Sequence, residues 1–130
     1  MSKELNPQEI LDKIIEIDDR FPRRAYLFVM EAVSYTMEKL PIRRHITGRE
    51  LTISIKDFAI ERFGISVSLV FEEWNIKRTR DFGEIVFNLV NNGLLRKTPD
   101  DAIEDFDEVY DFKAVFETEF EIDLDTDLKV

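Results

Sequence analysis

The chain has 130 residues, no cysteine and a formal net charge of −10, a length typical of one domain with its own hydrophobic core. The lack of cysteine excludes disulfides, iron–sulfur clusters and thiol nucleophiles. Residues 25–30 are the longest apolar run, far shorter than the roughly 20 residues that span a bilayer. These features predict a cytoplasmic protein that does not enter a membrane.

The charge is divided very unevenly along the chain. Residues 1–97 carry 16 basic and 15 acidic side chains, whereas residues 98–130 carry 2 basic and 13 acidic ones. A strongly acidic segment of this kind is expected to meet a basic surface, either on a partner or on the chain's own arginines.

Helical signals fill the first forty residues. Asn6 can cap a helix that starts at Pro7, and apolar residues then recur at helical spacing as far as Ile17. Phe21 and Pro22 separate this helix from a second one. The expected inner stripe of the second helix steps by three or four residues through Tyr26, Met30, Val33, Met37 and Leu40. Further apolar residues on its sides predict a central helix that packs on more than one face.

A third helix is expected to follow Thr47. Thr47 and Glu50 have the spacing of a capping box, and Gly64 is placed to end the helix with a positive φ angle. The β-branched residues within 52–55 would also suit a strand. Helix is favoured because both of its ends carry capping signals.

The second half of the chain mixes helix with expected strand. Residues 67–74 have the apolar spacing of a short fourth helix, and a fifth helix is expected to be capped by Asp81 or by Thr79. Residues 94–97 then read as a strand and residues 109–112 as its returning partner.

This order of elements resembles a winged helix over residues 47–112, mainly through the junction of the fifth helix with Gly93 and Leu94. A winged helix usually has a further short strand, for which Ile65 is the one candidate. The sequence therefore predicts a mainly helical α+β fold, in which N-terminal helices pack on a winged-helix-like unit with a small β-hairpin. Residues 1–116 are expected to form a single globular domain, followed by an acidic C-terminal segment.

That segment, residues 117–130, alternates acidic residues with Phe120, Ile122, Leu124 and further apolar or threonine residues. Strict alternation is typical of a half-buried strand, or of an acidic and apolar tail that stays unfolded until it binds. The first part of the segment also fits a helix, since Phe112 and Phe116 have helical spacing.

No group of residues points to catalysis, to a metal or to a cofactor. His45 is the single histidine and adjoins two arginines in a connector, so it is interpreted as a surface residue. Asp123, Asp125 and Asp127 copy the first ligands of a calcium loop, but Leu128 stands where that loop needs glycine. The sequence predicts a non-catalytic protein without a metal site, a cofactor or a small-molecule substrate.

Two basic groups are candidates for an interaction surface. One lies around the fifth helix and could touch nucleic acid, but acidic residues on the same helix and in residues 100–105 oppose phosphates. The other lies near the ends of the second helix, and the acidic segment could fold back onto either basic group and mask a site. Together with the apolar residues of that segment, the candidates are Lys77, Arg78, Arg80, Asn88, Arg96, Arg43, Arg44, Phe120, Ile122 and Leu124.

Several stretches together resemble a family of small, uncharacterised bacterial proteins of unknown function. They include Phe21-Pro22, Arg44-His45-Ile46, residues 79–90 and residues 109–112, and the resemblance spans about residues 10–116. It implies a bacterial cytoplasmic protein and brings no activity, cofactor or catalytic residue.

The preferred function is therefore a protein-interaction or adaptor module that binds a protein partner or a second copy of itself. The alternative is a nucleic-acid-associated regulator whose acidic tail masks a basic patch. A carboxylate-based, metal-dependent hydrolase comes third.

Overall fold

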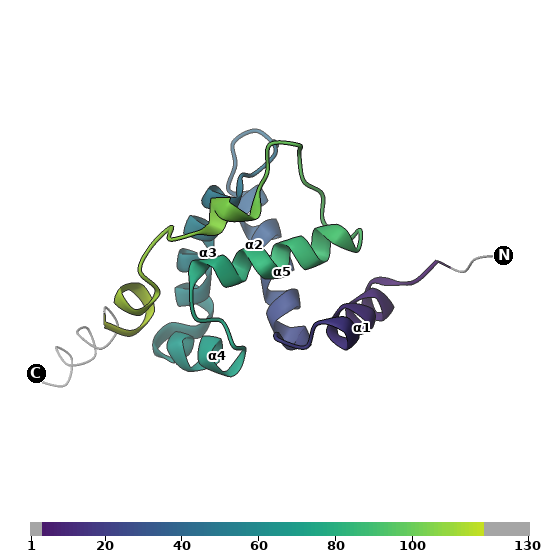
Figure 1. The fold of residues 1–130 in the computed structure, drawn as a ribbon. Helices are drawn as coiled ribbons and strands as arrows, with labels where there is room; N and C mark the ends of the chain where they lie inside the picture. Colours follow the sequence, from purple (N-terminus) through teal and green to yellow (C-terminus); the bar gives the residue numbers. More distant parts are fainter. Residues whose placement is uncertain (1–3, 119–130) are drawn as a thin grey trace, which may run out of the picture.

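Helices account for all the regular structure in residues 4–118, the part of the chain that the computed structural model describes (Figure 1). The elements, in chain order, are α1 (Pro7–Ile17), α2 (Arg23–Glu38), α3 (Gly48–Phe63), η1 (Gly64–Ser66), α4 (Val67–Glu73), α5 (Thr79–Asn91), η2 (Ile103–Phe106) and η3 (Ala114–Thr118). The five α-helices expected from the sequence are confirmed. No helix within residues 4–118 is long and apolar enough to cross a membrane.

Side-chain caps explain where α1 and α3 begin. The carboxamide of Asn6 accepts the backbone N–H of Glu9 at 2.9 Å, one turn into α1. At α3, the Thr47 hydroxyl accepts the N–H of Glu50 at 3.1 Å, and the Glu50 carboxylate accepts the N–H of Thr47 at 3.0 Å. This reciprocal capping box satisfies two N–H groups that an uncapped helix would leave unpaired. It settles residues 52–55 as helix, although their β-branched side chains also suit a strand.

The core is centred on α2, which packs against both α3 and α5. Its buried side chains are Ala25, Tyr26, Phe28, Val29, Ala32 and Thr36. The stripe expected from the sequence is therefore rotated from the true inner face, since Met30, Val33 and Met37 are only half-buried. The periodicity alone could not find that face, because a helix with two partners buries residues outside one narrow stripe.

Aromatic rings join the middle of the chain to its C-terminal part. Phe71 in α4 lies 5.8 Å from the ring of Phe28, 5.5 Å from Phe82 and 5.1 Å from Phe116, measured between centroids. The ring of Phe112 also lies 5.5 Å from the ring of Phe71. These edge-on and tilted contacts fix residues 112–116 on α4 and the first turns of α5.

The expected β-hairpin is wrong, because residues 4–118 contain no strand. Gly93 adopts a φ angle of 80°, and the N–H groups of Leu94 and Leu95 both turn back to the carbonyl of Leu89, at 2.9 and 3.4 Å. They close the end of α5 in the manner of a glycine C-cap and are not available to a strand partner. Because the hairpin is absent, the predicted winged-helix-like unit over residues 47–112 is also wrong. The predicted mainly helical character of the fold is confirmed.

Phe106, in η2 between the two expected strands, is buried against two helices. It lies between α3 and α5, where a Cβ atom on Gly48 would come within 2.6 Å of its ring and one on Gly83 within 2.7 Å. The hydroxyl of Thr79 donates to the carbonyl of Phe106 at 2.6 Å and accepts the N–H of Val109 at 3.2 Å. Thr79 is thus inside α5 and anchors this loop, so the expectation that it or Asp81 caps the helix is wrong.

Several predictions fall on residues 119–130, outside the described part of the chain. They are the strand or tail alternatives for the alternating segment, the roles of Phe120, Ile122 and Leu124, and the calcium-like Asp123–Asp127. The residues just before them, 112–118, are mostly helical.

Candidate functional site

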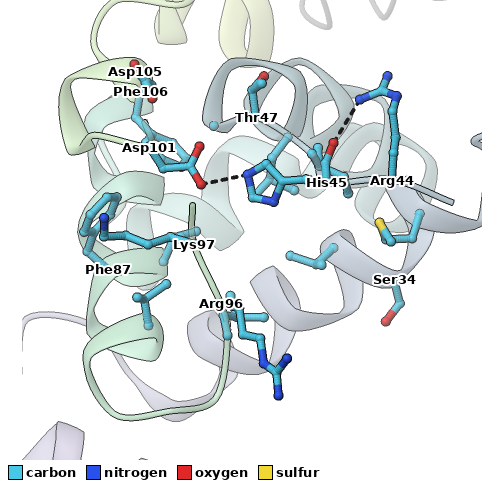
Figure 2. A pocket seen from close by; sticks show the side chains of 18 of the residues that line it. Ser34, Arg44, His45, Thr47, Phe87, Arg96, Lys97, Asp101, Asp105 and Phe106 are labelled. Carbon is cyan, nitrogen blue, oxygen red and sulfur yellow. Dashed lines mark hydrogen bonds and ion pairs between the residues drawn. The ribbon is translucent and has the colours of Figure 1, made fainter. Parts of the chain in front are cut away.

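A groove of about 430 Å³ opens between two loops, residues 39–47 and residues 92–102 (Figure 2). The second half of α2, the first turn of α3 and the second half of α5 form its walls. Its volume lies in the range of pockets that hold small molecules or a few side chains of a peptide.

The floor of the groove is apolar and comes from all three helices and both loops. Phe87 from α5 meets Phe106 edge to face, with 6.4 Å between the ring centroids. Val33 and Met37, which the sequence assigned to the core stripe of α2, are half-buried and line this space. The apolar lining is completed by Ile46, Leu51, Val86, Val90 and Leu95.

Basic side chains stand on both sides of the opening. Arg43 and Arg44 come from the loop before α3, and Arg96 and Lys97 come from the loop after α5. Figure 2 shows Arg44 and Arg96 on opposite sides of the groove. Within residues 4–118, neither Arg43 nor Arg96 forms an ion pair. No carboxylate in this part of the chain therefore neutralises these two guanidinium groups.

Arg44 is held in place by the same glutamate that caps α3. Its guanidinium donates two hydrogen bonds to the Glu50 carboxylate, at 3.0 and 2.7 Å. These bonds, together with the N–H of Thr47, lower the pKa of Glu50 from 4.5 to about 2. The pair is partly exposed, so it fixes the position of Arg44 more than it stabilises the fold.

Most of the acidic side chains that line the groove accept hydrogen bonds from neighbouring groups of the chain. The Asp101 carboxylate lies 2.7 Å from Nε2 of His45 and accepts the N–H of Thr98 at 2.8 Å. Asp105 accepts the N–H of Ala102 at 3.0 Å, and Glu38 stands exposed at the edge. His45, interpreted from the sequence as a surface residue, thus links the two loops across one end of the groove (Figure 2).

The basic candidate residues at the start of α5 do not line the groove. Arg80 donates to Asp107 at 3.1 Å and to Glu84 at 3.4 Å. The carboxylate of Asp81 accepts the N–H of Lys77 at 2.8 Å and lies 3.6 Å from Arg78. Local carboxylates thus offset much of the positive charge that a nucleic-acid surface would need.

The side chain of Asn88 makes its hydrogen bonds within the fold. Its side-chain amide donates to Asp18 and to the hydroxyl of buried Tyr26, both at 3.0 Å. Asp18 also accepts from Arg20, which is the main cause of its lowered pKa. This network ties α5 to the junction of α1 and α2, and Asn88 has no hydrogen left on its amide for a base edge.

Known proteins and metal geometry offer no further guide to the site. No family model, no curated protein and no solved structure matches the chain. The resemblance to small bacterial proteins therefore stays a prediction. Within residues 4–118, no three histidine, aspartate or glutamate side chains gather as a metal site would require.

Sequence reasoning named Arg43, Arg44 and Arg96, and the structure brings these three residues to one groove. It missed Lys97 and the whole apolar floor. Two signals were present: α2 has more apolar residues than one inner face can use, and Phe106 is a single aromatic residue within a run of acids. Such a residue needs a buried site, but the sequence does not say where that site lies.

Proposed function

We propose that the chain is a non-catalytic protein-interaction module of the cytoplasm. Its groove between α2, α3 and α5 takes an acidic segment with regularly spaced apolar side chains from a partner protein. The observation that carries the proposal is an apolar floor between two pairs of basic residues, Arg43 with Arg44 and Arg96 with Lys97.

The groove suits a particular pattern of ligand. In an extended chain, neighbouring side chains point to opposite sides. A segment that alternates acidic and apolar residues can therefore place its apolar side chains on the floor and keep its carboxylates at the level of the basic rim. Apolar burial would supply most of the affinity, at about 25 cal/mol for each Å² removed from water. The rim charges would select the partner and speed its approach.

The nucleic-acid alternative receives less support from the same residues. A phosphate backbone needs a continuous basic surface, whereas Arg80 is paired with two acids and Asn88 is bonded inside the fold. The acidic residues 100–105 adjoin the rim, and they would repel phosphates.

The proposal is tested with a fluorescent peptide in which glutamate alternates with phenylalanine or leucine. Fluorescence anisotropy would report its binding to the full chain. The groove variant combines Arg43→Glu with Arg96→Glu, and the control combines Lys77→Glu with Arg78→Glu, two exposed basic residues outside the groove. Both variants change the net charge equally.

The groove variant should weaken binding about tenfold or more, which corresponds to about 1.4 kcal/mol, and the control should change it little. A peptide with serine in place of its apolar residues should bind far more weakly. Equal losses in the two variants would mean non-specific attraction and would contradict the proposal.

A further inference from the structure

The two loops that border the groove are joined at one end by a pair of side chains, His45 and Asp101. Nε2 of His45 lies 2.7 Å from a carboxylate oxygen of Asp101 (Figure 2). Within residues 4–118, no other hydrogen bond or ion pair connects loop 39–47 with loop 92–102. This pair is therefore the polar link that holds the two loops together.

Resting on the function proposed above, we infer that His45 makes the groove sensitive to pH. When its imidazole is protonated, His45 forms an ion pair with Asp101 that links the loops more firmly, and it adds a positive charge to the groove. The groove then binds its acidic partner more tightly at about pH 6 than at about pH 8.

Asp101 is held in position for this pair by its own turn. The carboxylate oxygen that faces His45 also accepts the N–H of Thr98 at 2.8 Å, and the N–H of Asp101 donates to the carbonyl of Thr98 at 3.1 Å. The Asp101 side chain is only 16% exposed, against 41% for His45. A fixed carboxylate that is largely shielded from water attracts a nearby positive charge more strongly than a mobile surface carboxylate does. The charged imidazole therefore has a counter-ion already in place.

His45 is the single histidine of the chain, and histidine is the residue type that ordinarily changes charge between about pH 5 and 8. Carboxylates, lysine and arginine ordinarily keep their charge over this range. Besides Asp101, charged side chains surround the groove from each element except α5, whose contribution is apolar. They are Glu38 of α2, Arg43 and Arg44 of loop 39–47, Glu50 of α3 through its bonds to Arg44, Arg96 and Lys97 of loop 92–102, and Asp105 of η2.

The direction of the effect follows from the charges. The glutamates of an acidic ligand stay ionised over this range, so the charge that changes is on His45. The complex favours the protonated imidazole, and the affinity must therefore rise as the pH falls. One exposed charge typically changes an affinity by about threefold to fivefold.

The link between the loops is tested first without any ligand. NMR signals of the His45 imidazole and of the backbone amides are followed in the labelled full chain from about pH 5.5 to 8. The amide signals of Thr98 and Asp101, on the opposite loop, should titrate with the same midpoint as the imidazole. In His45→Gln, which does not titrate in this range, they should stay constant. Amides of Thr98 and Asp101 that do not follow the imidazole would overturn the inference.

The effect on binding is then measured with the alternating peptide by fluorescence anisotropy at about pH 6 and about pH 8. The wild type should bind about threefold to fivefold more tightly at the lower pH, whereas His45→Gln should bind equally at both. The control combines His45→Gln with Arg78→His, which moves the titrating side chain to an exposed position outside the groove. It should show no dependence on pH.

Two results of the binding experiment would overturn the inference while the proposed function stands. One is a wild-type affinity that does not change with pH. The other is a pH dependence that persists in His45→Gln or returns with Arg78→His, because overall charge and not the position of His45 would then control binding. Failure of the proposed function is seen separately, as peptide binding that does not respond to Arg43→Glu with Arg96→Glu at either pH.

Discussion

Gly83→Ala tests the insertion of Phe106 between α3 and α5. A Cβ atom at position 83 would lie 2.7 Å from Cγ and 2.9 Å from Cβ of Phe106. These atoms are at the base of the side chain, so they cannot move away unless the backbone moves. The Thr79 hydroxyl holds that backbone through its 2.6 Å hydrogen bond to the Phe106 carbonyl.

The expected magnitude is a balance of two effects. Alanine in the interior of a helix is favoured over glycine by about 1 kcal/mol, whereas overpacking a tight site costs about 1–3 kcal/mol. Gly83→Ala should therefore lower the free energy of unfolding by about 1 kcal/mol. Phe106→Ala alone should lower it by about 3–5 kcal/mol, because it leaves a cavity.

The double variant separates packing from helix propensity. With Phe106→Ala present, the clash is gone, so Gly83→Ala should become stabilising by about 1 kcal/mol. Urea unfolding of the four proteins gives the coupling energy, expected at about 2 kcal/mol. If Gly83→Ala stabilises the protein while Phe106 is intact, the ring does not lie against α5 and the reasoning is refuted.

Three further changes test the caps and the polar network by urea unfolding. Thr47→Ala should cost about 1 kcal/mol, because it removes the cap of α3; a wild-type value would contradict the capping box. Folding lowers the pKa of Glu50 from 4.5 to about 2, so its contribution is full above pH 4.5 and lost as the pH falls towards 2. Glu50→Gln should flatten this part of the stability profile, by less than about 1 kcal/mol at an exposed pair with Arg44, and an unchanged slope would count against the pair. Asn88→Ala should cost about 1–2 kcal/mol, and Lys77→Ala, the exposed control, less than about 0.5 kcal/mol.

Local signals predicted the helices well. The capping box of Thr47 and Glu50 is a contact between residues three apart, and its geometry follows from their spacing. The hairpin prediction was wrong because the same residues fit two local structures. Leu94 and Leu95 could equally pair in a strand or close the end of α5 after Gly93, and the sequence pattern did not distinguish them.

The candidate site was predictable in its charges but not in its shape. Arg43 and Arg44 stand out in the sequence as basic residues in a connector, and Arg96 as a basic residue in an expected strand. The groove exists because the loop before α3 approaches the loop after α5, a contact that His45 and Asp101 make at 2.7 Å. Periodicity within one helix carries no information on such a pairing of distant loops.

The central claim is that the groove between α2, α3 and α5 binds acidic and apolar segments. The most direct test is an NMR titration of the ¹⁵N-labelled full chain with the alternating peptide. The account predicts that amide shifts concentrate at groove residues such as Ile46, Leu51, Val90 and Leu95, and that Lys77 and its neighbours stay unchanged. Shifts that gather at the start of α5, or that spread evenly over the surface, would contradict it.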